Sequence, residues 1–321
     1  MWRHHPRGRH GRSRSDGLQR HLPSGHQHSR HRVVRVRQRL IRVSDLIERF
    51  LAGERRALSR ILTRVENGTP EGREYLRQLY PRSGRAHTIG ITGGAGSGKS
   101  SLTGSLASEL RKRGHEVGVI AVDPSSPFTQ GAILGDRIRM QDLVLDPGVF
   151  VRSMASRGAL GGLAPTIDDV VAVMDAFGFP YVFIETVGAG QDEVEIAGTA
   201  LTTVLVNNPG TGDDIQALKA GIIEIADVLV VNKADRPGAD VLVSQLRALL
   251  SLAPSEGRDI PILSTVATTG DGVPELVDAI DEHRAWLDTS GELDRHRRQE
   301  ARHQVLSVAQ RILLEQIRRE T

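Results

Sequence analysis

The chain of 321 residues contains no cysteine and no long apolar run. The lack of cysteine excludes disulfide bonds, thiolate metal sites and cysteine nucleophiles, so that only His, Asp and Glu remain as strong metal ligands. No uninterrupted apolar stretch approaches the ~20 residues of a transmembrane helix, and the N-terminus lacks the apolar segment of a secretory signal. We therefore expect a cytoplasmic protein that makes no use of a membrane.

Acidic residues are almost absent from residues 1–42, which hold twelve arginines, seven of the twelve histidines and a single acid, Asp16. This tail carries a net charge of +11, whereas the remaining 30 basic and 38 acidic residues give −8. Because the positive charge is confined to the tail, no nucleic-acid partner is expected. The tail is too poor in apolar residues to fold, and we predict disorder. Its composition is compatible with a metal store, a transit peptide or translation from a start codon upstream of the native one.

Apolar periodicity predicts a helix from Ser44 to Asn67 and a second one over Pro70–Tyr80, and these two helices form an N-terminal segment, residues 43–85. From residue 86 to 288, short β-branched runs alternate with amphipathic stretches such as Ser100–Arg113. The predicted strands are His87–Thr92, Val117–Val122, Val149–Arg152, Tyr181–Glu185, Thr203–Asn207, Val228–Val231 and Ile260–Thr265. The alternation predicts a three-layer α/β domain with a mainly parallel sheet, whose ligands bind at the carboxyl ends of the strands.

Residues 289–321 are highly charged and carry an apolar stripe at helical spacing. The stripe consists of Val305, Val308, Ala309, Ile312, Leu313 and Ile317. It is compatible with a helix packed on the core, and equally with a C-terminal helical arm that forms a dimer or partner surface.

A Gly-rich loop follows the first predicted strand and opens the next helix, matching the pattern G-x-x-x-x-G-K-[ST] in its required context. The loop consists of Gly93, Gly94, Ala95, Gly96, Ser97, Gly98, Lys99, Ser100 and Ser101. Its backbone N–H groups and the helix N-terminus cradle phosphates, Lys99 neutralises the β- and γ-phosphates, and the Ser100 hydroxyl is a ligand for Mg²⁺. The chain has only four lysines, so a lysine at this position by chance is improbable.

A second motif, Asn232-Lys233-Ala234-Asp235, follows the predicted strand Val228–Val231. The Asp235 carboxylate pairs with the N1–H and N2 amino donors of guanine, while adenine would leave it facing a lone pair, and a buried unpaired polar group costs about 1–3 kcal/mol. The sequence thus predicts a nucleotide site that prefers GTP and GDP over ATP. Backbone amides of Val266, Ala267 and Thr268 are predicted to face guanine O6.

Carboxylates at two further strand ends and in one loop are candidates for the γ-phosphate and magnesium side. Glu185 ends an apolar strand and is followed by Gly188, at the place where GTPases carry a metal-binding acid and a γ-phosphate-sensing glycine. Asp123 ends a strand, and Asp136 lies in a Gly-bounded loop suited to a switch. Both aspartates are also compatible with ordinary caps or turns. The role of Gln191 stays open.

Several strings, from about Val43 to the C-terminus, together resemble the ArgK/MeaB family of methylmalonyl-CoA mutase-associated GTPases. The strings are VDPSSPFTQGAILGDRIRM, SRGALGGLAPT, IETVGAGQDE, GIIEIADVLVVNKADRPGAD and TVATTGDGVPEL. The resemblance implies a P-loop GTPase of the SIMIBI class, homodimeric, that acts as a chaperone of an adenosylcobalamin-dependent acyl-CoA mutase. It further implies catalytic and magnesium roles for Lys99, Ser100, Asp123, Asp136, Glu185 and Gly188.

The chain departs from the family pattern at three places. The P-loop has Gly94-Ala95 where the family commonly has Pro, Asn207-Asn208 replace apolar residues before Pro209, and the C-terminal arm is short. Two other functions are compatible with parts of the sequence. A nickel-insertion GTPase would explain the His-rich tail but usually carries Cys motifs, and a transport-associated kinase is disfavoured by the guanine motif.

Overall fold

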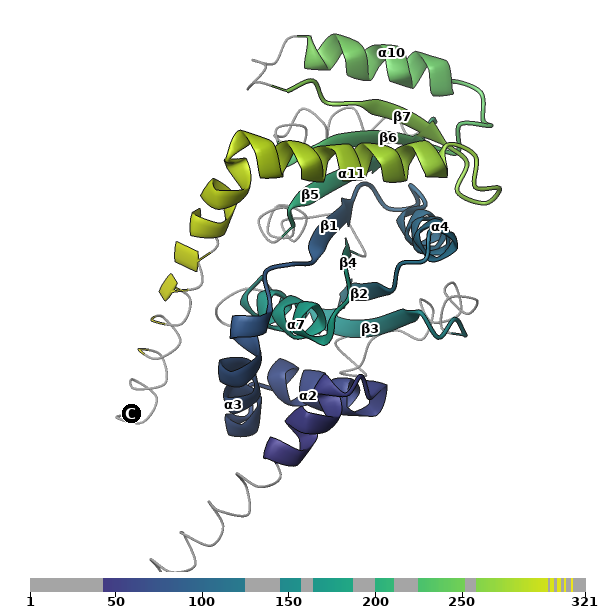
Figure 1. Ribbon diagram of the computed structural model, residues 1–321. Coiled ribbons are helices and arrows are strands. Elements are labelled where there is room, and N and C mark those ends of the chain that lie inside the picture. Colours follow the sequence, from purple (N-terminus) through teal and green to yellow (C-terminus); the bar gives the residue numbers. More distant parts are fainter. Residues whose placement is uncertain are drawn as a thin grey trace, which may run out of the picture. The chain divides into compact units, whose positions relative to one another are not determined.

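Figure 1 shows the computed structural model, which describes residues 43–124, 145–156, 164–186, 200–210, 225–251 and 258–299, with positions 301, 302, 305, 306, 309 and 313. For Asp123 and the few other residues next to these gaps, only the backbone is described. The chain divides into two units, Met1–Asp45 and Leu46–Thr321, and the fold below belongs to the second. Within the described residues, no helix combines the length and the apolar character needed to span a membrane.

In the described part of the chain, seven parallel strands form one sheet in the order β3-β2-β4-β1-β5-β6-β7. The strands are β1 (His87–Thr92), β2 (Val117–Pro124), β3 (Val149–Ser156), β4 (Tyr181–Thr186), β5 (Thr202–Asn207), β6 (Val228–Asn232) and β7 (Ile262–Thr265). All six residues of the central strand β1 are buried, as expected for a parallel strand covered on both faces. The predicted parallel α/β fold is confirmed, with strand ends shifted by at most two residues on most strands and by four on β3.

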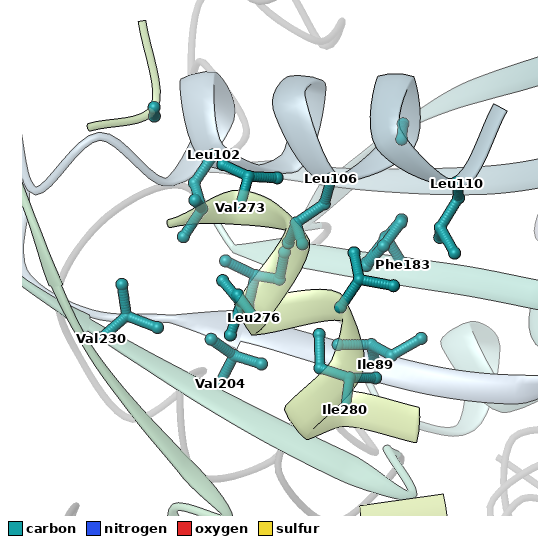
Figure 2. Packing of buried hydrophobic residues seen from close by; sticks show 14 of the residues in the cluster. Ile89, Leu102, Leu106, Leu110, Phe183, Val204, Val230, Val273, Leu276 and Ile280 are labelled. Atoms are coloured by element: carbon teal, nitrogen blue, oxygen red, sulfur yellow. The ribbon is translucent and has the colours of Figure 1, made fainter. Parts of the chain in front are cut away.

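One face of the sheet is covered by α4 (Lys99–Lys112) and α11 (Val273–Ser290). Leu102, Leu106 and Leu110 recur every four residues along α4 and pack with Ile89 and Phe183 of the sheet (Figure 2). This spacing places the three leucines on one side of the helix. The position of α4 over the centre of the sheet therefore fixes where the loop that precedes it lies.

The other face carries α7 (Ala164–Phe177) and α10 (Ala239–Leu250). Gly118 of β2 lies against Met174 of α7 and Phe179, whereas its neighbours in the strand face α4 and α11. Helix α10 packs on Leu205 of β5 and Leu229 of β6. Their neighbours along each strand point to the opposite face, toward α11. Three layers result, and the loops at the carboxyl ends of the strands lie along one edge.

The N-terminal segment of the second unit differs from the prediction of one helix from Ser44 to Asn67. Residues 46–51 are helical, the chain then turns, and α2 (Arg55–Glu66) begins anew. The break lies at Gly53, whose φ of 82° is accessible to glycine at little cost. Helix α3 (Pro70–Leu79) starts as predicted, with the Thr69 side chain accepting the N–H of Gly72, and a short 3₁₀ helix, η1 (Tyr80–Arg82), follows.

Helices α2 and α3 pack on α7 and add a fourth layer beside the edge strand β3 (Figure 1). Arg55 of α2 donates to the Val149 carbonyl over 2.6 Å, and Arg152 of β3 forms an ion pair with Glu66. Covering an edge strand in this way blocks pairing with other chains.

The C-terminal part begins with α11, which runs two residues past the predicted boundary at 288 and ends before Gly291. Residues 292–299 are helical again, and Leu293 is buried. Arg297 of this helix donates to the Gly84 carbonyl over 2.8 Å. Of the predicted apolar stripe, Val305, Ala309 and Leu313 are exposed, whereas Val308, Ile312 and Ile317 lie outside the described residues.

Candidate functional site

The Gly-rich loop lies between the end of β1 and α4, where the sequence predicts it. Two of its glycines are required by close approach: a Cβ on Gly93 would lie 2.1 Å from the Val206 carbonyl oxygen, and a Cβ on Gly98 would lie 2.4 Å from the Asn232 Nδ2 atom. Both also have positive φ, 139° and 95°. Any side chain at these positions would push the loop away from β5 and β6.

Lys99, the first residue of α4, is 7% exposed and reaches back over the loop. Its ammonium donates to the carbonyl of Gly93 and, over 3.0 Å, to that of Gly94. The positive charge is therefore held at the mouth of the loop next to the N-terminus of α4, where helix dipole and ammonium both favour an anion.

Ser100 of α4 and Glu185 of β4 are in direct contact through their side chains. The Ser100 hydroxyl donates to Glu185 Oε1, and Glu185 is 1% exposed. The parallel register pairs Glu185 with Ile91, which places the carboxylate beside the origin of the Gly-rich loop. A hydroxyl and a carboxylate are hard oxygen donors of the kind that Mg²⁺ prefers, so these two side chains fit the predicted magnesium site.

Asn232, at the end of β6, connects the Gly-rich loop with the loop after β7. Its side-chain amide donates to the Ser97 carbonyl over 2.9 Å. Its side-chain oxygen accepts the Thr265 hydroxyl, over 3.2 Å, and the Ala267 N–H, over 3.1 Å. Asn232 is 1% exposed, so these bonds are shielded from water. The residue acts as a clamp between two of the predicted nucleotide-binding segments.

Lys233 and Asp235 lie in the turn that follows Asn232, the last residue of β6. Lys233 has φ 57°, and among the described residues it is the non-glycine residue with positive φ. Its ammonium donates to the Gly96 carbonyl over 2.6 Å, so the aliphatic stem spans from β6 to the Gly-rich loop. Asp235 is exposed, and the N–H of Ala234 between them is held by the Thr265 carbonyl over 3.0 Å.

The loop after β7 is held tightly by its own backbone and by two side chains. The Val266 N–H donates to the Asp271 carbonyl over 2.9 Å, and the Ala267 N–H goes to Asn232. The Ala267 carbonyl accepts the hydroxyl of Ser105, a residue of α4, over 2.5 Å. Of the three amides predicted to face guanine, two are therefore used inside the protein, and within the described part of the chain the Thr268 N–H has no intramolecular acceptor.

The structure thus places Lys99, Ser100, Glu185, Asn232 and Lys233 around one loop, with residues 266–268 beside it. The side chain of Asp123 and all of Asp136, Gly188 and Gln191 lie outside the described residues. Ser105 and Thr265 were not predicted. Thr265 is the first residue of the string TVATTGDGVPEL but has no role assigned from it, and Ser105 belongs to no motif. Both contribute single hydroxyls whose partners are more than 30 residues away in the chain.

A second polar cluster lies at the opposite, amino edge of the sheet. The Thr202 hydroxyl lies 2.7 Å from His87 Nε2 and 2.8 Å from His283 Nδ1, and His283 Nε2 lies 3.3 Å from Asp227 Oδ1. Burial lowers the pKa of both histidines to about 3 and raises the pKa of Asp227 to about 6. Thr202 has no exposed surface, so the hydroxyl that joins the two imidazoles is closed to solvent.

Comparisons with known proteins identify the family of the chain. A family model described as methylmalonyl Co-A mutase-associated GTPase MeaB matches residues 58–321. The chain belongs to the MeaB family. The resemblance read from the motifs is thereby confirmed.

Several relatives align with this chain over most of their length. A protein of Pyrococcus abyssi whose name describes it as a GTPase is 50% identical over 275 residues, which cover 84% of this chain and 85% of that protein. GTPase ArgK of Escherichia coli is 35% identical, covering 81% of each. The methylmalonic aciduria type A homolog of Mus musculus is 31% identical, covering 85% of this chain and 70% of that protein.

Among solved structures, one titled LAO/AO transport system kinase is 25% identical and superposes with a TM-score of 0.71 over 85% of both chains. The seven-stranded sheet therefore has the P-loop NTPase fold of that protein. Since the family and the relatives from Pyrococcus abyssi and Escherichia coli are GTPases by name, this MeaB-family chain is a GTPase and binds guanine nucleotides.

Proposed function

We propose that this GTPase is a chaperone of an adenosylcobalamin-dependent acyl-CoA mutase of the methylmalonyl-CoA mutase type. It gates the loading of the cofactor and protects the mutase from inactivation. The observation that carries the proposal is the match of residues 58–321 to a family described as mutase-associated. The relation to a methylmalonic aciduria protein over 85% of the chain supports it.

The nucleotide is held at the carboxyl edge of the sheet in this proposal. Residues 93–101 bind the phosphates, Lys99 offsets the charge of the β- and γ-phosphates, and Asp235 pairs with the N1–H and N2 amine of guanine. The Lys233 stem covers one face of the base. The Thr268 N–H donates to O6, because the other two amides of residues 266–268 already have acceptors inside the protein.

Magnesium is the second part of the site. Ser100 and Glu185 are proposed to hold the ion, together with Asp123 and Asp136, with Gly188 next to the γ-phosphate. When bound, Mg²⁺ neutralises the charge that develops on the phosphate oxygens. The partly buried hydrogen bond between Ser100 and Glu185 holds the hydroxyl and the carboxylate next to each other at the start of α4.

The C-terminal arm, residues 289–321, is the proposed surface for a homodimer or for the mutase. Val305, Leu306 and Leu313 are each more than half exposed in the single chain, and exposed apolar side chains in one segment favour a protein partner.

The function is tested with the purified protein and an adenosylcobalamin-dependent mutase freed of its cofactor. The proposal expects the mutase to accelerate GTP hydrolysis, and expects cofactor loading, followed by the cobalamin absorbance of the mutase fraction, to require GTP and this protein. Equal hydrolysis with and without mutase, together with unchanged loading, would contradict the chaperone role and leave the GTPase activity standing.

A further inference from the structure

We infer that Ser105 of α4 is a positioning residue for guanine recognition: it fixes the peptide that presents the Thr268 N–H to the base. The inference rests on the proposed guanine site and adds a residue that belongs to none of the nucleotide-binding motifs. It starts from the shortest described contact between α4 and the loop after β7, the 2.5 Å bond from the Ser105 hydroxyl to the Ala267 carbonyl.

The planar peptide between Ala267 and Thr268 links the direction of its carbonyl to that of its N–H. The Ala267 carbonyl and the Thr268 N–H belong to one planar trans peptide, and in such a unit C=O and N–H point in opposite directions. A side chain that holds the carbonyl therefore also sets the direction of the N–H. Ser105 has one hydroxyl proton, and its bond to Ala267 is shorter than its 3.1 Å contact with the Ser101 carbonyl of its own helix.

The preceding peptide is held from the other side. Asn232 accepts the Ala267 N–H over 3.1 Å, so both polar groups of Ala267, which is 7% exposed, are bound by side chains from β6 and α4. Thr268 itself is exposed, and within the described ranges its N–H has no intramolecular acceptor. The buried Asn232 and the partly buried Ser105 thus fix both sides of Ala267, and the next amide, that of Thr268, is left for the base.

The location of Ser105 gives this contact a functional meaning. It lies on the helix whose first residues, Lys99 and Ser100, are the phosphate and magnesium residues of the proposed site. A rigid helix therefore connects the phosphate end of the nucleotide with the loop that reads O6. With Ser105 in place, the distance between the two recognition points is set by α4 as well as by the clamp at Asn232.

The test compares the affinities of GDP and 6-thioguanosine diphosphate by calorimetry. The two nucleotides share N1–H and the N2 amine, but sulfur at position 6 is the weaker acceptor. Ser105→Ala is expected to narrow the preference for GDP by about 2- to 12-fold, the range for one hydrogen bond. Ser105→Thr keeps the hydroxyl and should restore the wild-type preference.

The matched control is Ser244→Ala on α10, a helical serine whose hydroxyl bonds to the carbonyl four residues earlier, at Asp240, and to nothing in the site. It should leave both affinities unchanged. If Ser105→Ala melts too early to titrate, Ser105→Cys provides the same comparison with a weak donor.

Equal weakening of both nucleotides, or an unchanged preference in a folded Ser105 variant, would overturn the positioning role. A wild type that does not distinguish GDP from ADP would overturn the guanine site itself, and the inference with it.

Discussion

Replacing Asn232 by Ala is expected to weaken nucleotide binding and to lower the stability of the fold together. The asparagine makes three buried hydrogen bonds, to the Ser97 carbonyl, the Thr265 hydroxyl and the Ala267 N–H. Alanine removes the side-chain partner of all three groups in a region that water does not reach. The phosphate loop and the guanine loop then lose their common support.

The size of the effect follows from the number and burial of these bonds. A typical net contribution is about 0.5–1.5 kcal/mol per hydrogen bond, and a buried group left unpaired costs about 1–3 kcal/mol. Three bonds give a loss of roughly 2–4 kcal/mol, because the exposed loop after Ala267 can relax and recover part of the cost. A loss of this size in binding corresponds to about 30- to 1,000-fold weaker affinity.

Asn207→Ala is the matched control, since Asn207 is also a buried asparagine at a strand end, on the neighbouring strand β5. Its described side-chain bond is one long contact, 3.4 Å to the Leu205 carbonyl, so it should cost less than Asn232→Ala in both assays. The assays are calorimetric GDP titration and urea denaturation. Loss of less than threefold in affinity with unchanged stability for Asn232→Ala would refute the clamp.

Three further predictions concern charge. Lys99→Ala should abolish tight triphosphate binding, because it removes the ammonium held at the loop, and a variant that hydrolyses GTP at the wild-type rate would contradict this. Asp235→Asn should exchange GTP for xanthosine triphosphate, since the amide can donate to the carbonyl that replaces the guanine amine, and unchanged GTP affinity would exclude Asp235 as the base-reading residue. Lowering the pH from 6.5 toward 4 should destabilise the fold by roughly 1.4–2.8 kcal/mol per pH unit. The folded pKa values of His87 and His283, near 3, lie below their unfolded values, so protons bind the unfolded chain first and favour unfolding. The raised pKa of the partly exposed Asp227 has the opposite effect and offsets part of the stability loss caused by one histidine. Urea midpoints at pH 5 and 7 that coincide would contradict this last prediction.

The parallel sheet could be predicted from the sequence because its strands are short β-branched runs followed by helical patterns. The exceptions have local causes. The predicted helix from Ser44 to Asn67 breaks at Gly53, where the chain takes a positive φ, and an apolar pattern that continues past a glycine does not reveal such a turn.

The motifs of the site could also be predicted from the sequence, whereas the hydrogen bonds that connect them could not. The patterns around Lys99 and Asn232 are read as phosphate and base motifs. The bonds that join them depend on which strand ends lie side by side: Asn232 and Ser97 are 135 residues apart. Likewise, the Ser105 contact with Ala267 spans 162 residues, and a lone serine in a helix carries no signal of it.

The proposed chaperone role requires that nucleotide state controls association with the mutase, and one calorimetric titration tests this requirement most directly. An adenosylcobalamin-dependent acyl-CoA mutase is titrated with the protein loaded with GDP or with a non-hydrolysable GTP analogue. Linkage between the two sites predicts affinities that differ by roughly 5- to 150-fold, corresponding to about 1–3 kcal/mol. Asp136→Ala should move the ratio toward one without loss of guanine selectivity. Equal affinity of both wild-type states, or no binding to any such mutase, would contradict the account.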